Sequence, residues 1–302
     1  MKIIFFTQSN WSIPAIIELG KTHEISGVVT QLQGPNFNPQ LIGFLEQSNL
    51  PIIDWDQISK DGWASISKDS DIGISFGFSK KIKEEIFSSF PMGVLNVHFG
   101  KLPKYAGPAP LFWTLKNQEP TLTISFHLID QDWDAGDLVY EEDIPIFPGE
   151  PFGLLGARAA QISGGKLNTL LGRMDSIQRT PLKVNSHQLK RPTELDLTID
   201  WKELKANEIE ALVNASNPGY GGAITTFRGS QLKILEVSPA EVNEVGIFSP
   251  GTIVYSDPNY GVFVICGDYN CLRLNILQLE GTIITGQKIA ALGVRVNEKF
   301  GS

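Results

Sequence analysis

Asparagine, histidine and aspartate gather in two short stretches of the chain. Asn96 and His98 are two residues apart in GVLNVHFGKLPKYAGPAP, residues 93–110, and they end an apolar run. The stretch HLIDQDWDAGD, residues 127–137, holds four aspartates. No nucleophilic Ser or Cys motif stands beside them. These residue types suit direct transfer of a group between two bound substrates, because the attacking atom then belongs to the acceptor.

Each of the three residue types has a distinct part in such a transfer. An Asn amide donates a hydrogen bond to an oxyanion as it forms. A His moves a proton, and a carboxylate orients the imidazole and favours its charged form. A lone His is more often structural. His98 stands out because it ends a strand beside Asn96 and because a Pro- and Gly-rich loop follows it.

The aspartates also allow a metal site, with His98 and His127 as additional ligands. The stretch does not follow the calcium-loop pattern, because no Gly stands at the sixth position from Asp130. We therefore expect no metal. At Asp130, Asp132 and Asp137 the simpler expectation is that the carboxylates shape a turn.

The first half of the chain alternates short β-branched runs with helical patterns. Strands are predicted at residues 2–7, 26–31, 71–77 and 93–99, and helices at 12–21, 38–49 and 79–90. This alternation predicts a mainly parallel sheet covered on both faces, the α/β class. Ligands of such sheets bind beyond the carboxyl ends of the strands. Asn96 and His98 lie at such an end, and their spacing turns both to one side.

The second half changes character. Strands are predicted at 121–129 and 138–146, followed by a long helical stretch interrupted by glycines at 151–174. After a polar segment and one more helix come short strands between Gly, Pro, Asn and Asp turns, which predict a small β-barrel or sandwich. We therefore predict a catalytic domain at 1–177, a linker at 178–205 and a second domain at 206–302.

Composition limits the function classes. The chain has 302 residues and a net charge of −8, which argues against a protein whose main work is gripping nucleic-acid phosphates. No apolar run reaches the roughly 20 residues that cross a bilayer. Cys266 and Cys271 are expected to be reduced core thiols of a cytoplasmic protein. No Gly-x-Gly-x-x-Gly follows the first strand, which excludes a dinucleotide site there.

The two chemical stretches together resemble the signature of the folate-dependent formyltransferases. This family includes the methionyl-tRNA and the nucleotide-sugar formyltransferases. The resemblance is carried by Asn96-Val97-His98, by LPKYAGPAP at 102–110 and by Asp134 of DAGD. It extends over nearly the whole chain, through MKIIFFTQSNWSIPAI at 1–16, SFGFSKKIKEEIF at 75–87, TIDW at 198–201 and NPGYGGAITTF at 217–227.

The resemblance implies a Rossmann-like formyltransferase domain and a C-terminal β-barrel like an OB fold. It implies transfer of a formyl group from 10-formyltetrahydrofolate, as co-substrate, to a primary amine. By the same resemblance Asn96 stabilises the oxyanion, His98 is the general acid/base and Asp134 tunes His98. The donor is expected against the following residues, mostly through their backbone: Lys80, Lys81, Ile82, Leu102, Pro103, Asp130, Gln131, Asp132 and Trp133.

The acceptor is where the chain departs from the family pattern. Ala106 stands where the family has an Arg, and a methyl group cannot bind an anion as a guanidinium does. The loop LQGPNFNPQ at 32–40 is short and uncharged, whereas the tRNA enzymes have a long basic loop. Residues 206–302 carry six basic and nine acidic side chains, a poor platform for an RNA backbone.

We therefore expect the acceptor to be a small amine, an amino-sugar nucleotide or a carrier-tethered aminoacyl group, rather than a nucleic acid. A methionyl-tRNA formyltransferase is the main alternative. A hydrolase that releases formate from the same donor is a second one. A non-catalytic folate- or nucleotide-binding module is the last, and the complete set of Asn96, His98 and Asp134 argues against it. The oligomeric state stays open.

Overall fold

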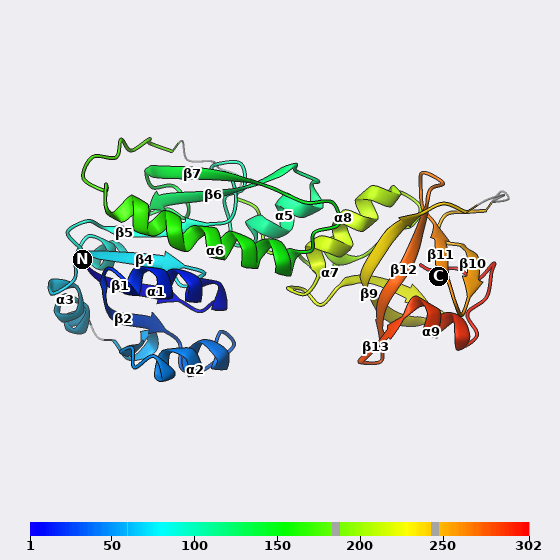
Figure 1. Cartoon of the computed structure of the whole chain (residues 1–302), viewed down its shortest axis with the longest axis horizontal. Helices are drawn as coiled ribbons and strands as arrows, with labels where there is room; N and C mark the ends of the chain where they lie inside the picture. Colours follow the sequence, from blue (N-terminus) through cyan, green and yellow to red (C-terminus); the bar gives the residue numbers. More distant parts are fainter. Residues whose placement is uncertain (59, 183–187, 243–247, 302) are drawn as a thin grey trace. The chain divides into compact units, whose positions relative to one another are not determined.

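The computed structural model describes residues 1–58, 60–182, 188–242 and 248–301 (Figure 1). Backbone contacts divide the chain into two compact units. The first unit comprises residues 1–110, 121–145 and 156–190, and the second comprises 111–120, 146–155 and 191–302. Two short segments of the N-terminal half thus group with the C-terminal half. The predicted linker at 178–205 includes residues 183–187, which lie outside the described residues.

The first unit is built on a seven-stranded sheet of order β3-β2-β1-β4-β5-β6-β7. Neighbouring strands from β3 to β5 are parallel, whereas β6 pairs antiparallel with both β5 and β7. The strands are β1 (Lys2–Thr7), β2 (Glu24–Thr30), β3 (Ile52–Asp54), β4 (Ile72–Phe76), β5 (Val94–His98), β6 (Thr121–Leu128) and β7 (Leu138–Pro145). The predicted mainly parallel α/β sheet is confirmed. The β6–β7 pair departs from it because its connection is too short for a parallel crossover.

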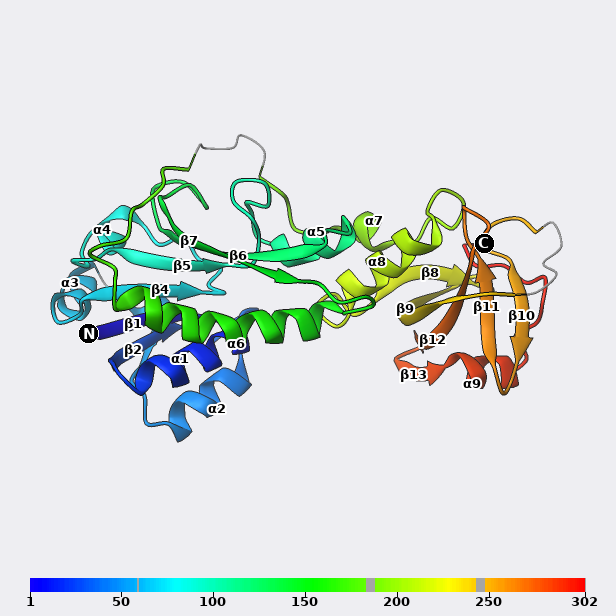
Figure 2. The same cartoon turned by 45° about the horizontal axis from the view of Figure 1, so that its top comes forward.

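Helices cover both faces of this sheet (Figures 1 and 2). On one face, Ile4, Phe6, Val29 and Val94 pack with Trp63 and Ile86 of two of these helices. The helical elements of the first unit before β5 are η1 (Asn10–Ser12), α1 (Ile13–Gly20), α2 (Pro39–Gln47), η2 (Trp55–Gln57), α3 (Lys60–Lys68) and α4 (Glu84–Phe87). The β5–β6 connection holds α5 (Pro110–Lys116), most of which belongs to the second unit. The helix predicted at 79–90 shrinks to α4. Ile82 is buried in the same core from an extended segment, so tertiary packing overrides the helical pattern.

The other face carries the long helix α6 (Phe152–Leu171), which runs beside α1 in both views. The glycines predicted to interrupt it do not break it. At Gly164 a Cβ would lie 3.1 Å from the Pro14 carbonyl oxygen of α1, and at Gly156 it would meet the Trp11 ring at 2.2 Å. These glycines therefore let α6 approach α1 and the segment before it closely.

The second unit holds an antiparallel sheet of order β10-β11-β12-β9-β8, with β13 paired to β12. Phe300 bridges to Phe227 at one edge and Lys299 bridges to Thr252 at the other, so the end of the chain links the two edges. The unit's elements are α7 (Glu194–Leu197), α8 (Ala206–Ser216), β8 (Ala223–Phe227), β9 (Ser230–Ala240), β10 (Ile253–Asp257), β11 (Gly261–Ile265), β12 (Cys271–Leu279), β13 (Thr282–Thr285) and α9 (Gly286–Ala291).

Two further expectations concern the thiols and the membrane. Cys266 and Cys271 are both free and buried, and burial is the main cause that raises the pKa of Cys266 to about 12. Its thiol is therefore protonated and unreactive at neutral pH. Among the described residues no helix is both long and apolar enough to span a bilayer.

Candidate active site

Strand pairing gathers polar side chains on one face of the sheet at β5 and β6. Asn96 lies opposite His127, and His98 lies opposite Ser125. Directly opposed residues of an antiparallel pair point to the same face, and successive residues along a strand point to opposite faces. The apolar pair Val97 and Phe126 between them therefore faces the opposite side. The four polar side chains form one cluster, which we call the β5–β6 cluster.

His98 is held in one orientation within this cluster. It is only 6% exposed, and its Nε2 lies 2.8 Å from the Tyr105 carbonyl oxygen. A carbonyl only accepts, so Nε2 carries the proton and donates it. In the neutral ring Nδ1 is then the basic nitrogen, and it lies 3.6 Å from Oδ1 of Asp134.

Burial lowers the pKa of His98, and the like charge of His127 adds to this, while Asp134 opposes it. The net direction is downward, which keeps His98 neutral at neutral pH. A neutral imidazole with a free Nδ1 can accept a proton. The carboxylate beside Nδ1 then stabilises the imidazolium that forms.

Asp134 reaches the cluster from the loop between β6 and β7. Its Oδ2 accepts a 2.8 Å hydrogen bond from the Gly107 N–H, and its Oδ1 lies 3.6 Å from both His98 Nδ1 and His127 Nε2. Burial by itself raises the pKa of this carboxyl. The two histidines and the Gly107 N–H outweigh burial and lower the pKa to about 2. The backbone of Asp134 is left-handed, with φ +53°, a region that Asp tolerates better than most residues.

The loop after β5 is held by close backbone contacts. The Leu189 N–H donates to the Ala106 carbonyl at 2.9 Å. At Gly107, with φ +124°, a Cβ would lie 2.2 Å from the Leu189 carbonyl oxygen. Only glycine fits there, and its N–H is the one that anchors Asp134. The Gly107 N–H in this loop thus holds the Asp134 carboxylate close to His98.

Two of the three segments predicted to contact the donor approach each other. Gln131 Nε2 donates to Glu84 Oε2 at 2.7 Å, which ties the 130–134 loop to the helix that follows Lys80 and Lys81. Trp133 is 45% exposed, and its carbonyl accepts a 2.8 Å bond from Gln188 Nε2.

Not all residues predicted to bind the formyl donor expose their side chains. Ile82 and Leu102 are 3% and 5% exposed, so they contribute packing and backbone rather than an open surface. Lys81 and Asp132 are exposed, and Asp130 Oδ1 accepts the Gln131 N–H. The structure thus links two of the three predicted segments, 80–82 and 130–133, while Leu102 and Pro103 lie in the loop after β5, and the contact of all three with a folate stays a prediction.

A polar network that the sequence did not single out joins the loops after β1 to β4. Gln8 Nε2 donates to Gln31 Oε1 at 2.7 Å, and Gln31 Nε2 donates to Asp56 Oδ2 at 2.7 Å. Gln8 Oε1 in turn accepts from the N–H and the hydroxyl of Ser79, at 3.0 and 2.7 Å. The network holds the start of the predicted donor segment at the carboxyl edge of the parallel strands. The available signal was that Gln8 and Gln31 each directly follow a strand.

Sequence reasoning considered His127 only as a metal ligand, and the structure places it within the β5–β6 cluster instead. Its Nε2 lies 3.0 Å from Nδ2 of Asn96. Within the described ranges, no group of three or more His, Cys, Asp or Glu side chains is arranged to hold a metal ion.

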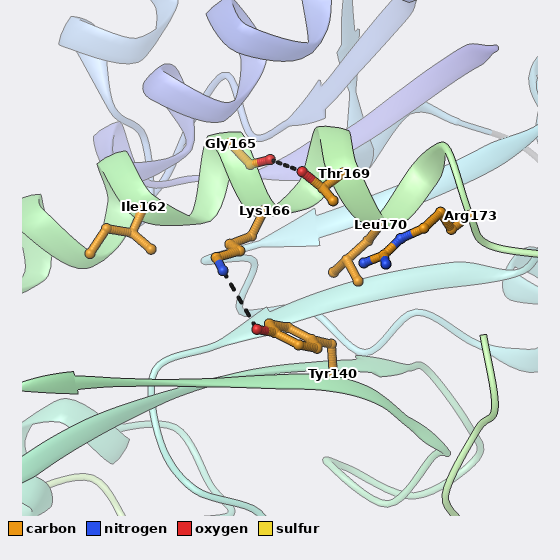
Figure 3. A pocket seen from close by; sticks show the side chains of 7 residues that line it. All are labelled: Tyr140, Ile162, Gly165, Lys166, Thr169, Leu170 and Arg173. Atoms are coloured by element: carbon orange, nitrogen blue, oxygen red, sulfur yellow. Dashed lines mark hydrogen bonds between the residues drawn. The ribbon is translucent and has the colours of Figure 1, made fainter.

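A separate cavity of about 280 Å³ lies between α6 and β7 (Figure 3). It faces away from the β5–β6 cluster, because Tyr140 pairs with Phe126, whose side chain points to the opposite side from His98. In this region Lys166 forms a 2.8 Å ion pair with Glu142. The cavity is lined by Tyr140, Ile162, Gly165, Lys166, Thr169, Leu170 and Arg173. The chemistry-bearing residues therefore do not belong to it.

Comparison with known proteins identifies the family. Residues 66–167 match the model described as formyl transferase, and residues 193–291 match the formyl transferase C-terminal domain. The chain belongs to the formyltransferase family. Both parts of the resemblance, the catalytic stretch and the C-terminal patterns, are thereby confirmed.

Curated relatives match this formyltransferase over most of its length. It is 27% identical over 281 residues to the methionyl-tRNA formyltransferase of Acetivibrio thermocellus, covering 88% of each chain. It is also 27% identical to that of Solibacter usitatus, over 100% of this chain and 99% of the relative. These names agree with the tRNA alternative better than with the small amine that we expected.

Solved structures share the fold of this formyltransferase. The sugar 3N-formyltransferase WlaRD, crystallised with dTDP and 5-N-formyl-THF, has a TM-score of 0.66 at 18% identity, covering 90% of this chain and 96% of WlaRD. HypX from Aquifex aeolicus in complex with tetrahydrofolic acid has a TM-score of 0.65 at 16% identity. This formyltransferase is covered to 98% in that comparison but spans only about half of HypX, 48% of that chain.

Proposed function

We propose that this formyltransferase moves a formyl group from 10-formyltetrahydrofolate to a primary amine. The observation that carries the proposal is the convergence of Asn96, neutral His98 and ionised Asp134 at the carboxyl end of a buried strand. The donor supplies the formyl carbon. Its binding surface is supplied by the 130–134 loop and the segment before α4, joined by Gln131 and Glu84, together with Leu102 and Pro103.

The side chains divide the proton and charge transfers between them. As the amine nitrogen bonds to the formyl carbon, negative charge develops on the formyl oxygen, and an N–H of Asn96 stabilises it. Nδ1 of His98 takes the proton that the attacking nitrogen loses, and Asp134 at 3.6 Å stabilises the imidazolium. The bond from the formyl carbon to the donor nitrogen then breaks. His98 gives its proton to that nitrogen and returns to its neutral form.

For the acceptor, methionyl-tRNA has the better support. The relatives that match over most of the chain carry that name, and the match includes the C-terminal domain. A small-molecule amine, such as an amino-sugar nucleotide, is the second candidate. It is favoured by the acidic balance of residues 206–302 and by Ala106, where the family pattern has an Arg.

The deciding experiment measures release of tetrahydrofolate from 10-formyltetrahydrofolate. The enzyme is incubated alone, with charged initiator tRNA, and with a pool of amines that includes amino-sugar nucleotides. Release only with an acceptor, together with a formylated product, supports transfer and names the acceptor class. Release without any amine indicates the hydrolase instead. If the enzyme binds tetrahydrofolate but releases none from 10-formyltetrahydrofolate in any mixture, the proposal is contradicted for these acceptors.

A further inference from the structure

We propose that His127 is a positioning residue that fixes the carboxamide of Asn96 with an N–H facing the reacting centre. The proposal rests on the proposed formyl transfer. It adds a residue that neither the motif nor the comparisons single out. His127 is 2% exposed and lies on β6 directly opposite Asn96.

The hydrogen bonds of His127 determine which nitrogen carries its proton. Nδ1 lies 2.8 Å from the Leu128 carbonyl oxygen. Since a carbonyl only accepts, Nδ1 must carry the proton and donate it. In the neutral ring Nε2 is then an acceptor, and the group 3.0 Å from it is Nδ2 of Asn96, which can only donate. The two bonds are consistent with a single tautomer of His127.

This tautomer determines the orientation of Asn96. One hydrogen of its NH₂ group is used by His127, which leaves the second hydrogen on the same nitrogen for another acceptor. Within the described residues the Asn96 side chain has no other hydrogen bond. Without His127 the amide could turn by 180° about its terminal bond and present its oxygen, which would repel negative charge on the formyl oxygen.

Asp134 also lies beside His127, at the same distance as from His98. Its Oδ1 lies 3.6 Å from Nε2 of His127, an electrostatic contact beyond hydrogen-bond distance, and its Oδ2 accepts from the Gly107 N–H. Water has little access to a ring that is 2% exposed. The nearest hydrogen-bond partner of His127 Nε2 is therefore Nδ2 of Asn96, at 3.0 Å, while Asp134 lies beside both histidines.

The kinetic test compares His127→Leu with His127→Gln. Leucine removes the acceptor but keeps an apolar side chain of similar size. The Oε1 of glutamine can accept from Asn96 near the position of Nε2. We expect His127→Leu to lower kcat about 10- to 100-fold with the KM for the donor nearly unchanged. We expect the kcat of His127→Gln to lie within a few-fold of the wild-type value.

A double variant distinguishes positioning of Asn96 by His127 from a contribution of His127 to the stability of the sheet. In the Asn96→Ala background, His127→Leu should cause little additional loss, because the group that it positions is gone. A multiplicative loss would overturn the proposal and assign His127 to the stability of the sheet. Equal losses in His127→Leu and His127→Gln would overturn it too. Thermal melts of all variants show whether loss of folding accounts for any effect.

An NMR measurement tests the geometry without relying on activity. Long-range proton–nitrogen correlations of the labelled full chain should show the proton of His127 on Nδ1, with Nε2 bare. The side-chain NH₂ signals of Asn96 should shift in His127→Leu and stay unchanged in His23→Ala, a variant of the residue that directly precedes β2. A proton on Nε2, or unchanged Asn96 signals, would overturn the proposal. If formyl transfer itself fails while these signals behave as expected, the proposed function fails and the geometry stands.

Discussion

In the proposed transfer Asn96 and His98 serve different steps, so both variants should lose turnover for different reasons. By this proposal Asn96→Ala removes the hydrogen-bond donor to the formyl oxygen, and His98→Ala removes the proton carrier. We expect each to lower turnover by roughly 100-fold or more while tetrahydrofolate binding, measured by calorimetry, is largely retained. His23→Ala is the matched control, since His23 directly precedes β2, at the opposite end of the parallel strands. Near-normal turnover of either site variant would remove that residue from the mechanism.

The role proposed for Asp134 leads to a prediction about the pH dependence of kcat/KM. Its charge opposes the burial that lowers the pKa of His98, so Asp134→Asn should lower that pKa further. His98 accepts a proton only in its neutral form, which exists above its pKa. The acid limb of kcat/KM should therefore move to lower pH, while the plateau falls because the imidazolium loses its partner. A pH–rate profile of the two proteins checks this. An unmoved acid limb would restrict Asp134 to shaping the loop.

At the scale of elements, the meeting of two loops decides whether the site exists. Gly107 in one loop anchors Asp134 in the other, and a Cβ on Gly107 would overlap the Leu189 carbonyl at 2.2 Å. We expect Gly107→Ala to lower stability by about 1–3 kcal/mol and to reduce kcat, because the loop must shift away from Asp134. Chemical denaturation and steady-state kinetics measure the two effects.

Gly34→Ala provides the control for Gly107→Ala. Gly34 lies in another loop, between β2 and α2. Gly34 also has a positive φ, +85°, but a Cβ there would meet nothing within 4 Å. It should carry only the backbone cost, on the order of 1 kcal/mol, and leave kcat unchanged. If both variants behaved alike, the contact with Leu189 would have no part in placing Asp134.

At the scale of the whole molecule, the charge distribution limits how the acceptor can be held. The chain carries −8 overall, and residues 206–302 offer six basic side chains. Each phosphate contact contributes roughly −0.9 to the slope of log K against log salt. If methionyl-tRNA is the acceptor and this segment provides the contacts, the slope should be shallower than roughly −5.

Filter binding of charged tRNA between 50 and about 200 mM salt measures this slope. A steeper slope would place the RNA contacts on basic residues elsewhere in the chain. Salt-insensitive, weak binding without formylation would favour the small-molecule acceptor. The same mixture with an amino-sugar nucleotide provides the comparison.

Much of the architecture follows from local sequence patterns. The alternation of β-branched runs and helical spacing predicts the parallel part of the sheet, because strand and helix periods are properties of neighbouring residues. The two-residue spacing of Asn96 and His98 likewise predicts their common side, and the motif identifies the family. The turn-rich pattern after residue 217 predicts the antiparallel second unit.

Only the tertiary structure decided how the distant parts meet. The opposition of His127 and Asn96 depends on the register between β5 and β6, which no local pattern encodes. The approach of Asp134 to His98 depends on a hydrogen bond from the backbone N–H of Gly107, 27 residues away in the chain. The short α4 and the unbroken α6 follow from burial of Ile82 and from the close approach of Gly164 to α1. These outcomes are set by non-local packing and pairing, whereas the residue types of the proposed site can be read directly from the sequence.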